Sequence, residues 1–322
     1  MIHLKIVRSL LGALLSVFAV MPVVAQAQSV AVTSIVEHPA LDSIKDGVKA
    51  ALENSGLTEE KGLNWQFQTA QGNTAIAAQI ARKFVGDGPD VIVAIATPSA
   101  QAVVAATRDI PVVYSAVTDP VAAQLVESFE PSGTNVTGVS DMLDLERQIE
   151  LIRAVVPNAK TVGMVYNPGE ANSAVVVKQM REMLPAYGMT LMEASAPRTV
   201  DVGAAARSLI GNVDVIYTNT DNNVVSAYEA LVKVGNDAQI PLVASDPDSV
   251  KRGAVAALGV NYYDLGLQTG AMVIDILNGA DPGEMPSQLS EELELHVNLK
   301  AASQQGVTLS NDLIDSAAEV IR

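Results

Sequence analysis

Cysteine is absent from all 322 residues of the chain. Disulfides, thiolate nucleophiles, cysteine metal ligands and a lipid-modified cysteine are therefore excluded. Histidine is scarce: beyond the first 27 residues only His38 and His296 remain, and neither has a partner at HxxxH or HExxH spacing. A metal hydrolase site has no ligand set in this chain, so we expect no metal.

Sequence motifs typical of enzymes are missing as well. The chain contains no GxSxG nucleophile elbow and no GxxxxGK[ST] phosphate loop. Carboxylates are plentiful, but a glycosidase needs two of them opposed across one sugar, and the sequence does not establish that arrangement. We therefore predict that the protein is not an enzyme and uses no cofactor.

Basic residues are too few to balance the acidic ones. The chain has 20 Lys and Arg against 36 Asp and Glu, which gives a formal net charge of -16. Such a chain repels phosphate backbones, so we expect no nucleic-acid partner. Aromatic residues make up only 4% of the chain, which disfavours a sugar site built on aromatic platforms.

A long apolar run occurs only near the N-terminus. Residues 1–27 begin with basic side chains at Lys5 and Arg8. An apolar run from Leu10 to Val24 follows, and then the small-x-small sequence Ala25-Gln26-Ala27. The run is short for a membrane span of about 20 residues. We interpret residues 1–27 as a cleaved secretory signal peptide. Because no lipobox cysteine is present, export indicates the periplasm of a Gram-negative cell.

The rest of the chain contains an α/β pattern that occurs twice. From Asp90 to Val121 the sequence predicts a short buried strand, a polar turn, a helix and a second apolar strand. The same layout returns from Asp214 to Val250. The segments that precede the two copies, 30–56 and 161–188, also correspond in layout. The sequence therefore predicts two similar α/β lobes, each with a doubly wound, Rossmann-like sheet.

The length suits two domains of about 100–150 residues each. We assign residues 28–141 and 261–280 to lobe one, and residues 142–260 and 281–322 to lobe two. The chain then crosses between the lobes three times, near Asp141, Val260 and Pro282, and these crossovers are expected to act as the hinge.

Polar residues gather in the loops that follow the predicted strands. In open α/β sheets, ligands bind beyond the carboxyl ends of strands, and two such edges facing each other would form a cleft. The candidate ligand-binding residues are Glu37, His38, Thr97, Ser99, Thr118, Asp119, Asn167, Glu170, Asn172, Ser173, Thr220, Asp221, Asn222 and Asp246. Their excess of carboxylates suits an ammonium group.

Predicted helix starts at Ser99 and Ser173 complement these carboxylates. Their free N–H groups and the positive ends of the helix dipoles favour a ligand carboxylate. A zwitterion such as an α-amino acid satisfies both kinds of group. Structural roles remain open beside this interpretation: Thr97, Ser173 and Asn222 suit helix caps, and the Asp-Pro pairs at Asp119 and Asp246 suit turns.

Several segments resemble the ABC-transporter substrate-binding proteins of the tryptophan/tyrosine-binding type. The segments are VEHPALD (36–42), AQGN (70–73), AIATPSAQA (94–102), NVTGVSD (135–141), VYNPGEANS (165–173), YTNTDNNVVSA (217–227) and GVNYYDLGLQTG (259–270). The resemblance implies a type I periplasmic-binding-protein fold with a three-crossover hinge. It also implies cleft positions for Thr97, Asp119, Asn167, Glu170, Asn172, Ser173, Asp221 and Asn222.

The resemblance further implies delivery of a small solute, often an aromatic amino acid, to an ABC permease in the inner membrane with its cytoplasmic ATPase. We expect a monomer whose lobes close on the ligand. The carboxylate is expected on the amides at Thr97–Ser99 or Ser173, and the ammonium on Asp221 or Asp246. A nucleoside or sugar receptor, and a ligand-loaded sensor that docks a membrane receptor, remain alternatives.

Overall fold

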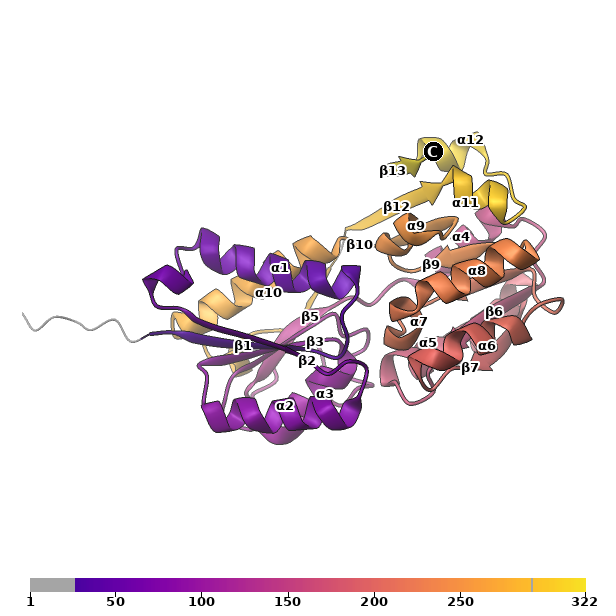
Figure 1. Cartoon of the computed structure of the whole chain (residues 1–322). Coiled ribbons are helices and arrows are strands. Elements are labelled where there is room, and N and C mark those ends of the chain that lie inside the picture. The colour runs from indigo at the N-terminus through magenta and orange to yellow at the C-terminus, as the bar shows by residue number, and fades with distance from the viewer. Residues whose placement is uncertain (1–26, 291) are drawn as a thin grey trace, which may run out of the picture.

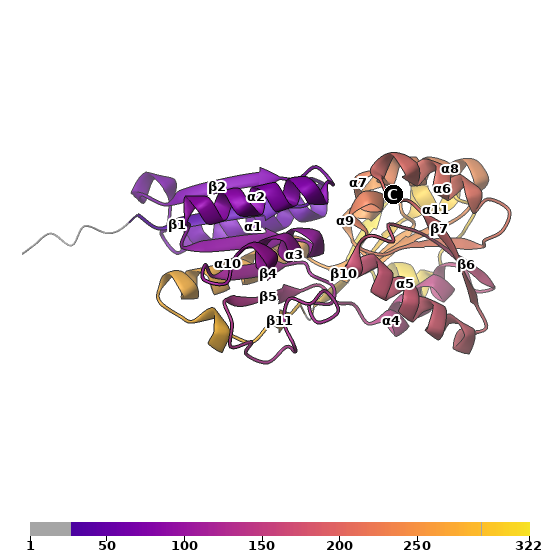
Figure 2. The ribbon, with the colours of Figure 1, turned by 90° about the horizontal axis from the view of Figure 1, so that it is seen from below.

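The two predicted halves form two α/β lobes in the computed structural model, which describes residues 27–290 and 292–322 (Figures 1 and 2). Each lobe holds one mostly parallel sheet with helices on both faces, so the predicted fold class is confirmed. Most of the predicted signal peptide lies outside the described residues. No helix in the described part of the chain combines the length and apolar character that a bilayer crossing requires.

Lobe one contains a six-stranded parallel sheet in the order β11-β5-β4-β3-β1-β2. Its strands are β1 (Ser29–Ser34), β2 (Asn64–Thr69), β3 (Val91–Ile95), β4 (Val112–Ser115), β5 (Val136–Ser140) and β11 (Gln288–Leu289). Helices α1 (Pro39–Asn54) and α10 (Tyr262–Leu277) cover one face, and α2 (Thr74–Asp87) and α3 (Thr97–Ala106) cover the other (Figure 1). Strands β3, β4 and β5 are buried along their whole length, as parallel strands covered on both faces must be.

Lobe two contains a seven-stranded sheet in the order β13-β12-β10-β9-β8-β6-β7, in which only the β10–β12 pair is antiparallel. Its strands are β6 (Thr161–Tyr166), β7 (Thr190–Ser195), β8 (Val215–Thr218), β9 (Leu242–Ala244), β10 (Ala256–Val260), β12 (Leu293–Asn298) and β13 (Glu319–Ile321). Side chains of α4 (Leu145–Val155), α5 (Ala171–Met183) and α11 (Leu299–Gln304) share one core cluster, joined at its edge by α12 (Asn311–Asp315). The opposite face is covered by α6 (Val202–Ser208), α7 (Asn222–Ser226), α8 (Tyr228–Ala238) and α9 (Asp248–Arg252).

Short 3₁₀ turns complete the chain at η1 (Glu59–Lys61), η2 (Leu184–Tyr187), η3 (Thr199–Asp201) and η4 (Pro282–Glu284). Close packing of α1 on α10 depends on glycine. A Cβ atom on Gly47 would collide with the carbonyl oxygen of Tyr263, and one on Gly266 would collide with that of Ile44. Helix α10, which follows lobe two in sequence, therefore lies directly on the first helix of lobe one.

The third crossing between the lobes differs from our prediction. We expected residues 281–322 in lobe two and a crossover near Pro282, but Gln288 and Leu289 pair with Val139 and Ser140 at the edge of the first sheet. The Oγ1 hydroxyl of Thr137 also donates to the carbonyl oxygen of Met285 at 3.1 Å. Residues 281–290 thus stay with lobe one, because a two-residue strand covers the open edge of β5. The chain crosses between Ser290 and the start of β12 at Leu293. The other two connections are residues 141–144 and Asn261.

Candidate ligand-binding site

Loops that follow parallel strands in the two lobes meet between them. Thr118, after β4, and Thr220, after β8, approach to 3.0 Å between their Oγ1 atoms. Gly72, after β2, lies beside Asn223 and Thr199 of lobe two. The carboxyl edges of both sheets therefore face each other, as required for a cleft.

Two neighbouring cavities lie between the lobes. The α5 cavity has a volume of about 20 Å³ and is bounded on one side by Val175 and Val176 of α5. The α1 cavity also has a volume of about 20 Å³ and is bounded by His38 and the start of α1. Asp141 and Thr220 line both cavities, so the two spaces adjoin at the first hinge connection. At this size each cavity has room for about one water molecule, so a larger ligand fits only when the lobes move apart.

Half of the fourteen predicted site residues line these cavities. Those that do are His38, Thr118, Asp119, Asn172, Thr220, Asn222 and Asp246. Thr97 and Ser99 are buried at the start of α3, directly after Ala96, which lines the α1 cavity. Glu37 is exposed and lies outside both cavities. The remaining four, Asn167, Glu170, Ser173 and Asp221, form a hydrogen-bonded network in lobe two, in which all but the half-buried Asn167 are buried.

Asp221 organises this network. Its Oδ2 atom accepts hydrogen bonds from the backbone N–H of Asn167 and the hydroxyl of Ser173, both at 2.6 Å, and its Oδ1 caps α7 through the N–H of Val224 at 3.0 Å. Asp221 is fully buried and lines neither cavity. Its position does not support the predicted contact with a ligand ammonium. The carboxylate instead joins two loops that follow neighbouring strands.

Glu170 holds the two asparagines that reach the α1 cavity. Its Oε2 atom accepts from the side-chain amides of Asn222 at 2.6 Å and Asn172 at 3.3 Å. Burial, followed by the nearby charge of Asp221, raises the pKa of Glu170 above its ordinary value. Glu170 therefore acts behind the cavity wall, where it fixes the orientation of side chains that line the cavity.

Four buried carboxylates surround the cleft: Asp141, Glu170, Asp221 and Asp246, each at most 4% exposed. Within the described residues, no Lys or Arg forms an ion pair with any of them. Burial is the largest cause of the raised pKa of each of the four carboxyls. Because an unpaired buried charge is costly, the two that line the cavities, Asp141 and Asp246, favour a cationic ligand group between the lobes.

The N-terminus of α3 offers the opposite polarity. Its N-cap residue, Ala96, has no side chain that could accept from the first-turn N–H groups. The hydroxyls of Thr97 and Ser99 are buried and have no hydrogen-bond partner among the described residues. A carboxylate placed here would meet N–H donors, hydroxyls and the positive end of the helix dipole.

Backbone strain occurs at the same place. Ala96 has φ 69° and Ala116 has φ 51°, and both residues line the α1 cavity at the ends of adjacent strands. Left-handed φ values cost energy in residues that carry a Cβ atom, and such residues concentrate at binding and catalytic sites. The strain thus supports the α1 cavity as part of a functional site.

His38 is a neutral donor or acceptor in the α1 cavity. Burial, with a smaller contribution from the charge of Arg252, lowers the pKa of His38 to about 3. Its Nδ1 atom has no partner among the described residues. The imidazole therefore adds hydrogen-bonding capacity at neutral pH without adding positive charge.

Sequence reasoning missed Asp141, Asn219 and Ser245 as site residues, although all three follow a strand and line the α5 cavity. Asp141 accepts from the hydroxyls of Thr118 at 3.1 Å and Tyr262 at 3.2 Å. It thereby connects the first hinge connection with the second. The sequence could have indicated all three, because each lies just after a predicted strand and adjoins or lies within a segment that we had already singled out.

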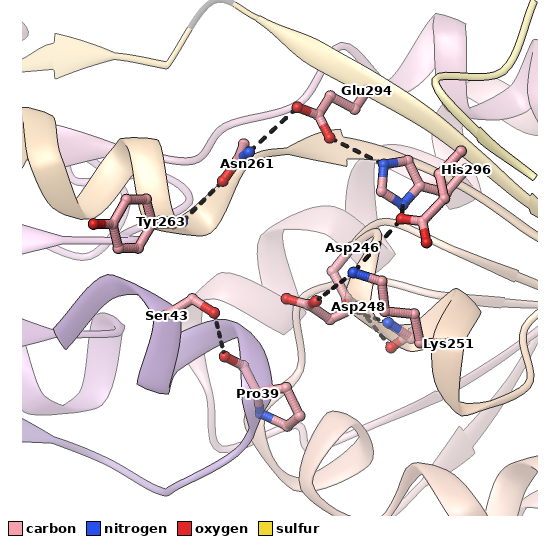
Figure 3. A network of polar contacts seen from close by, with 11 residues as sticks. Pro39, Ser43, Asp246, Asp248, Lys251, Asn261, Tyr263, Glu294 and His296 are labelled. Atoms are coloured by element: carbon pink, nitrogen blue, oxygen red, sulfur yellow. Dashed lines mark hydrogen bonds and ion pairs between the residues drawn. The ribbon is translucent and has the colours of Figure 1, made fainter. Parts of the chain in front are cut away.

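A second polar network lies on the hinge side of the cleft (Figure 3). His296 contacts Glu294 at 3.0 Å through Nε2 and Glu319 at 3.2 Å through Nδ1. Glu294 also accepts from the side-chain amide of Asn261 at 3.3 Å. This network ties the second connection to β12 and to the C-terminal strand. His296 is thus a structural residue, and no group of three metal-ligating side chains occurs in the described ranges.

Comparison with known proteins assigns the chain to a family. The family model for the ABC transporter substrate binding proteins matches residues 29–321. The chain belongs to this family. Among individual relatives, the tyrosine-binding protein of Clostridioides difficile (strain R20291) is 39% identical over 287 residues, which cover 88% of this chain and 83% of that protein. The predicted resemblance is confirmed.

Two solved structures of substrate-binding proteins are also similar to it. The ABC domain in complex with L-Trp from Streptococcus pneumonia has a TM-score of 0.88 at 31% identity, covering 92% of this chain and all of that one. The ligand-free, open structure of CD0873 from Clostridium difficile has a TM-score of 0.68 at 37% identity, covering 91% and 99%. The present chain is more similar in sequence to CD0873 but more similar in shape to the L-Trp complex. This difference is consistent with closed lobes in the present structure.

The pH dependence of stability tests whether the pKa of the buried Asp141 carboxyl is raised. Burial raises the pKa of Asp141 from 3.8 to about 6, so its protonated form is favoured in the folded state. The protonated Asp141 carboxyl stabilises the folded state relative to an ionised one. Its contribution to the free energy of unfolding is fully present below pH 4 and is lost as the pH rises through about 6. Asp141→Asn should therefore gain on the order of 3 kcal/mol relative to the unsubstituted protein between pH 4 and pH 8. Urea denaturation across this range measures the difference, and parallel pH curves would contradict it.

Proposed function

We propose that this substrate-binding protein closes its two lobes on an aromatic L-amino acid in the periplasm and delivers it to an ABC permease. The cleft supports a zwitterionic ligand, because buried carboxylates and the free start of α3 lie on its two walls. The single observation that carries the proposal is the set of buried carboxylates without a cationic partner. Among these, Asp246 lines the α1 cavity and accepts only from Ser249, at 2.8 Å from N–H and 2.7 Å from the hydroxyl.

The α5 cavity supports an aromatic side chain. Met142 and Leu143 line it from the first hinge connection, Leu145 from the start of α4, and Val175 and Val176 from α5. Burying a ring against such walls is favourable at about 25 cal/mol per Å² of apolar surface. The names of two relatives point the same way, since one is called tyrosine-binding and another was solved with L-Trp.

Isothermal titration calorimetry with the mature protein tests the proposal. L-Tyr, L-Trp and L-Phe are the candidate ligands, and nucleosides and hexoses are the competing classes. 3-(4-hydroxyphenyl)propionate is the matched control, because it keeps the ring and carboxylate of tyrosine but lacks the ammonium group. We expect binding of at least one aromatic amino acid and at least 100-fold weaker binding of the control, since a buried charge partner is lost. Binding of a sugar or nucleoside instead would overturn the proposal.

Transport and location are tested separately. N-terminal sequencing of the protein from a periplasmic fraction should show a chain that begins near Gln28, after the predicted cleavage site. Deletion of the gene should abolish high-affinity uptake of the radiolabelled ligand. Uptake that is unchanged, together with altered signalling, would favour the sensor alternative.

A further inference from the structure

Asn219 presents an unused hydrogen-bond acceptor in the α5 cavity. It directly follows β8, is 2% exposed and lines the cavity, and its Oδ1 atom has no partner among the described residues. Ser245 follows β9, lines the same cavity at 1% exposure, and its hydroxyl is also without a partner there. Buried polar atoms normally find a partner, so the carbonyl oxygen of Asn219, which can only accept, indicates a missing donor beside this cavity.

The orientation of the Asn219 amide follows from its neighbours. The hydroxyl hydrogen of Ser173 is directed to Oδ2 of Asp221 at 2.6 Å. Ser173 can therefore only accept from Asn219, and the amide nitrogen of Asn219 donates to it at 3.2 Å. This leaves the carbonyl oxygen as the free end of the side chain. Exchanging the amide oxygen and nitrogen would place two acceptors against each other.

The surroundings of this acceptor are otherwise suited to a ring. Apolar side chains from the hinge connection, α4 and α5 form one part of the remaining wall: Met142, Leu143, Leu145, Val175 and Val176. The buried carboxylates that suit an ammonium, Asp246 above all, line or adjoin the α1 cavity on the other side of Thr220. Asn219 lines only the α5 cavity and Asp246, the expected ammonium contact, lines only the α1 cavity, whereas Asp141 lines both.

From this arrangement we infer that Asn219, together with Ser245, recognises a hydrogen-bond donor on the ligand's aromatic ring, such as a phenolic O–H or an indole N–H. The inference rests on the proposed function and makes it more specific. A ligand ring with no donor leaves a buried carbonyl oxygen unsatisfied, which weakens binding. The site therefore selects tyrosine and tryptophan over phenylalanine by about 10- to 100-fold.

The first experiment uses the unsubstituted protein and needs no variant. Calorimetry compares L-Tyr, L-Phe and O-methyl-L-tyrosine, the last of which keeps the phenolic oxygen but has no hydrogen to donate. We expect L-Tyr to bind about 10- to 100-fold more tightly than either analogue. If L-Phe binds as tightly as L-Tyr, this inference is overturned while the proposed function stands. If none of the three binds and L-Trp does not bind either, the proposed function itself fails.

A second experiment identifies the residue. Asn219→Leu, which has a similar shape without polar atoms, should reduce the ratio of L-Tyr to L-Phe affinities to near one. Asn135→Leu is the matched control, because the Oδ1 atom of Asn135 also has no partner among the described residues but the residue lines neither cavity, and its ratio should equal that of the unsubstituted protein. An unchanged ratio in Asn219→Leu would show that another group recognises the ring. Equal loss for both ligands would assign Asn219 to the ammonium or to support of Ser173.

Discussion

Replacing Asp221 with alanine is expected to lower the free energy of unfolding by about 3–5 kcal/mol. The substitution removes the acceptor for the N–H of Asn167, the hydroxyl of Ser173 and the helix-capping N–H of Val224. Each buried donor left without a partner costs about 1–3 kcal/mol, and the lost cap costs about 1 kcal/mol. Urea denaturation with linear extrapolation measures the change.

Asp119→Ala is the control for this experiment. Asp119 makes the same kind of contact, accepting from the N–H groups of Val121 at 3.1 Å and Ala122 at 2.9 Å, but in an exposed turn. Water replaces those bonds, so the loss should stay near 1 kcal/mol or below. An Asp221→Ala protein of normal stability that fails to bind ligand would restore the sequence-based assignment of Asp221 as the ammonium contact.

Replacing Asp246 with asparagine is expected to weaken ligand binding by about 100- to 1,000-fold. Asp246 is 2% exposed, lines the α1 cavity and has no cationic partner among the described residues. Losing one member of a buried charge pair costs about 2–5 kcal/mol in affinity. Stability should change little or rise, because Asn keeps an acceptor for Ser249 and removes a buried charge.

Asp248→Asn is the matched control for Asp246→Asn. Asp248 lies two residues further on, on the hinge side, where it approaches Lys251 at 3.9 Å (Figure 3). It lines neither cavity of the cleft, so its substitution should leave the affinity within about threefold. Calorimetry with L-Tyr measures both variants. If Asp246→Asn binds as well as the unsubstituted protein, the ammonium lies elsewhere, with Asp141 as the next candidate.

The different positions of Asp221 and Asp246 in the structure could not be predicted from the sequence. Asp221 and Asp246 look alike in sequence, since each follows a short apolar strand and each precedes a helix start. In the structure, the carboxylate of Asp221 accepts a hydrogen bond from the backbone N–H of Asn167, 54 residues earlier, and Asp221 lines neither cavity. Asp246 meets only its neighbour Ser249 and stays at the cavity.

The predicted position of the third hinge crossing was wrong for a related reason. Strand β11 has only two residues, Gln288 and Leu289, which are too few to show a hydrophobic period. Its pairing is decided by the unpaired edge of β5, a strand about 150 residues earlier. Turn residues at Pro282 and Gly283 indicated a link, but not which lobe it would join.

The sequence by itself determined the two α/β lobes, the loops that carry the polar groups, and the family. Those features follow from local periodicity and from motifs of fixed order, both of which a linear chain displays. Only the tertiary structure decided which acid lines a cavity and which supports the loops, and where an amide such as Asn219 leaves its oxygen free. These outcomes depend on hydrogen bonds between residues about 50 positions apart, and their geometry exists only after the strands have assembled.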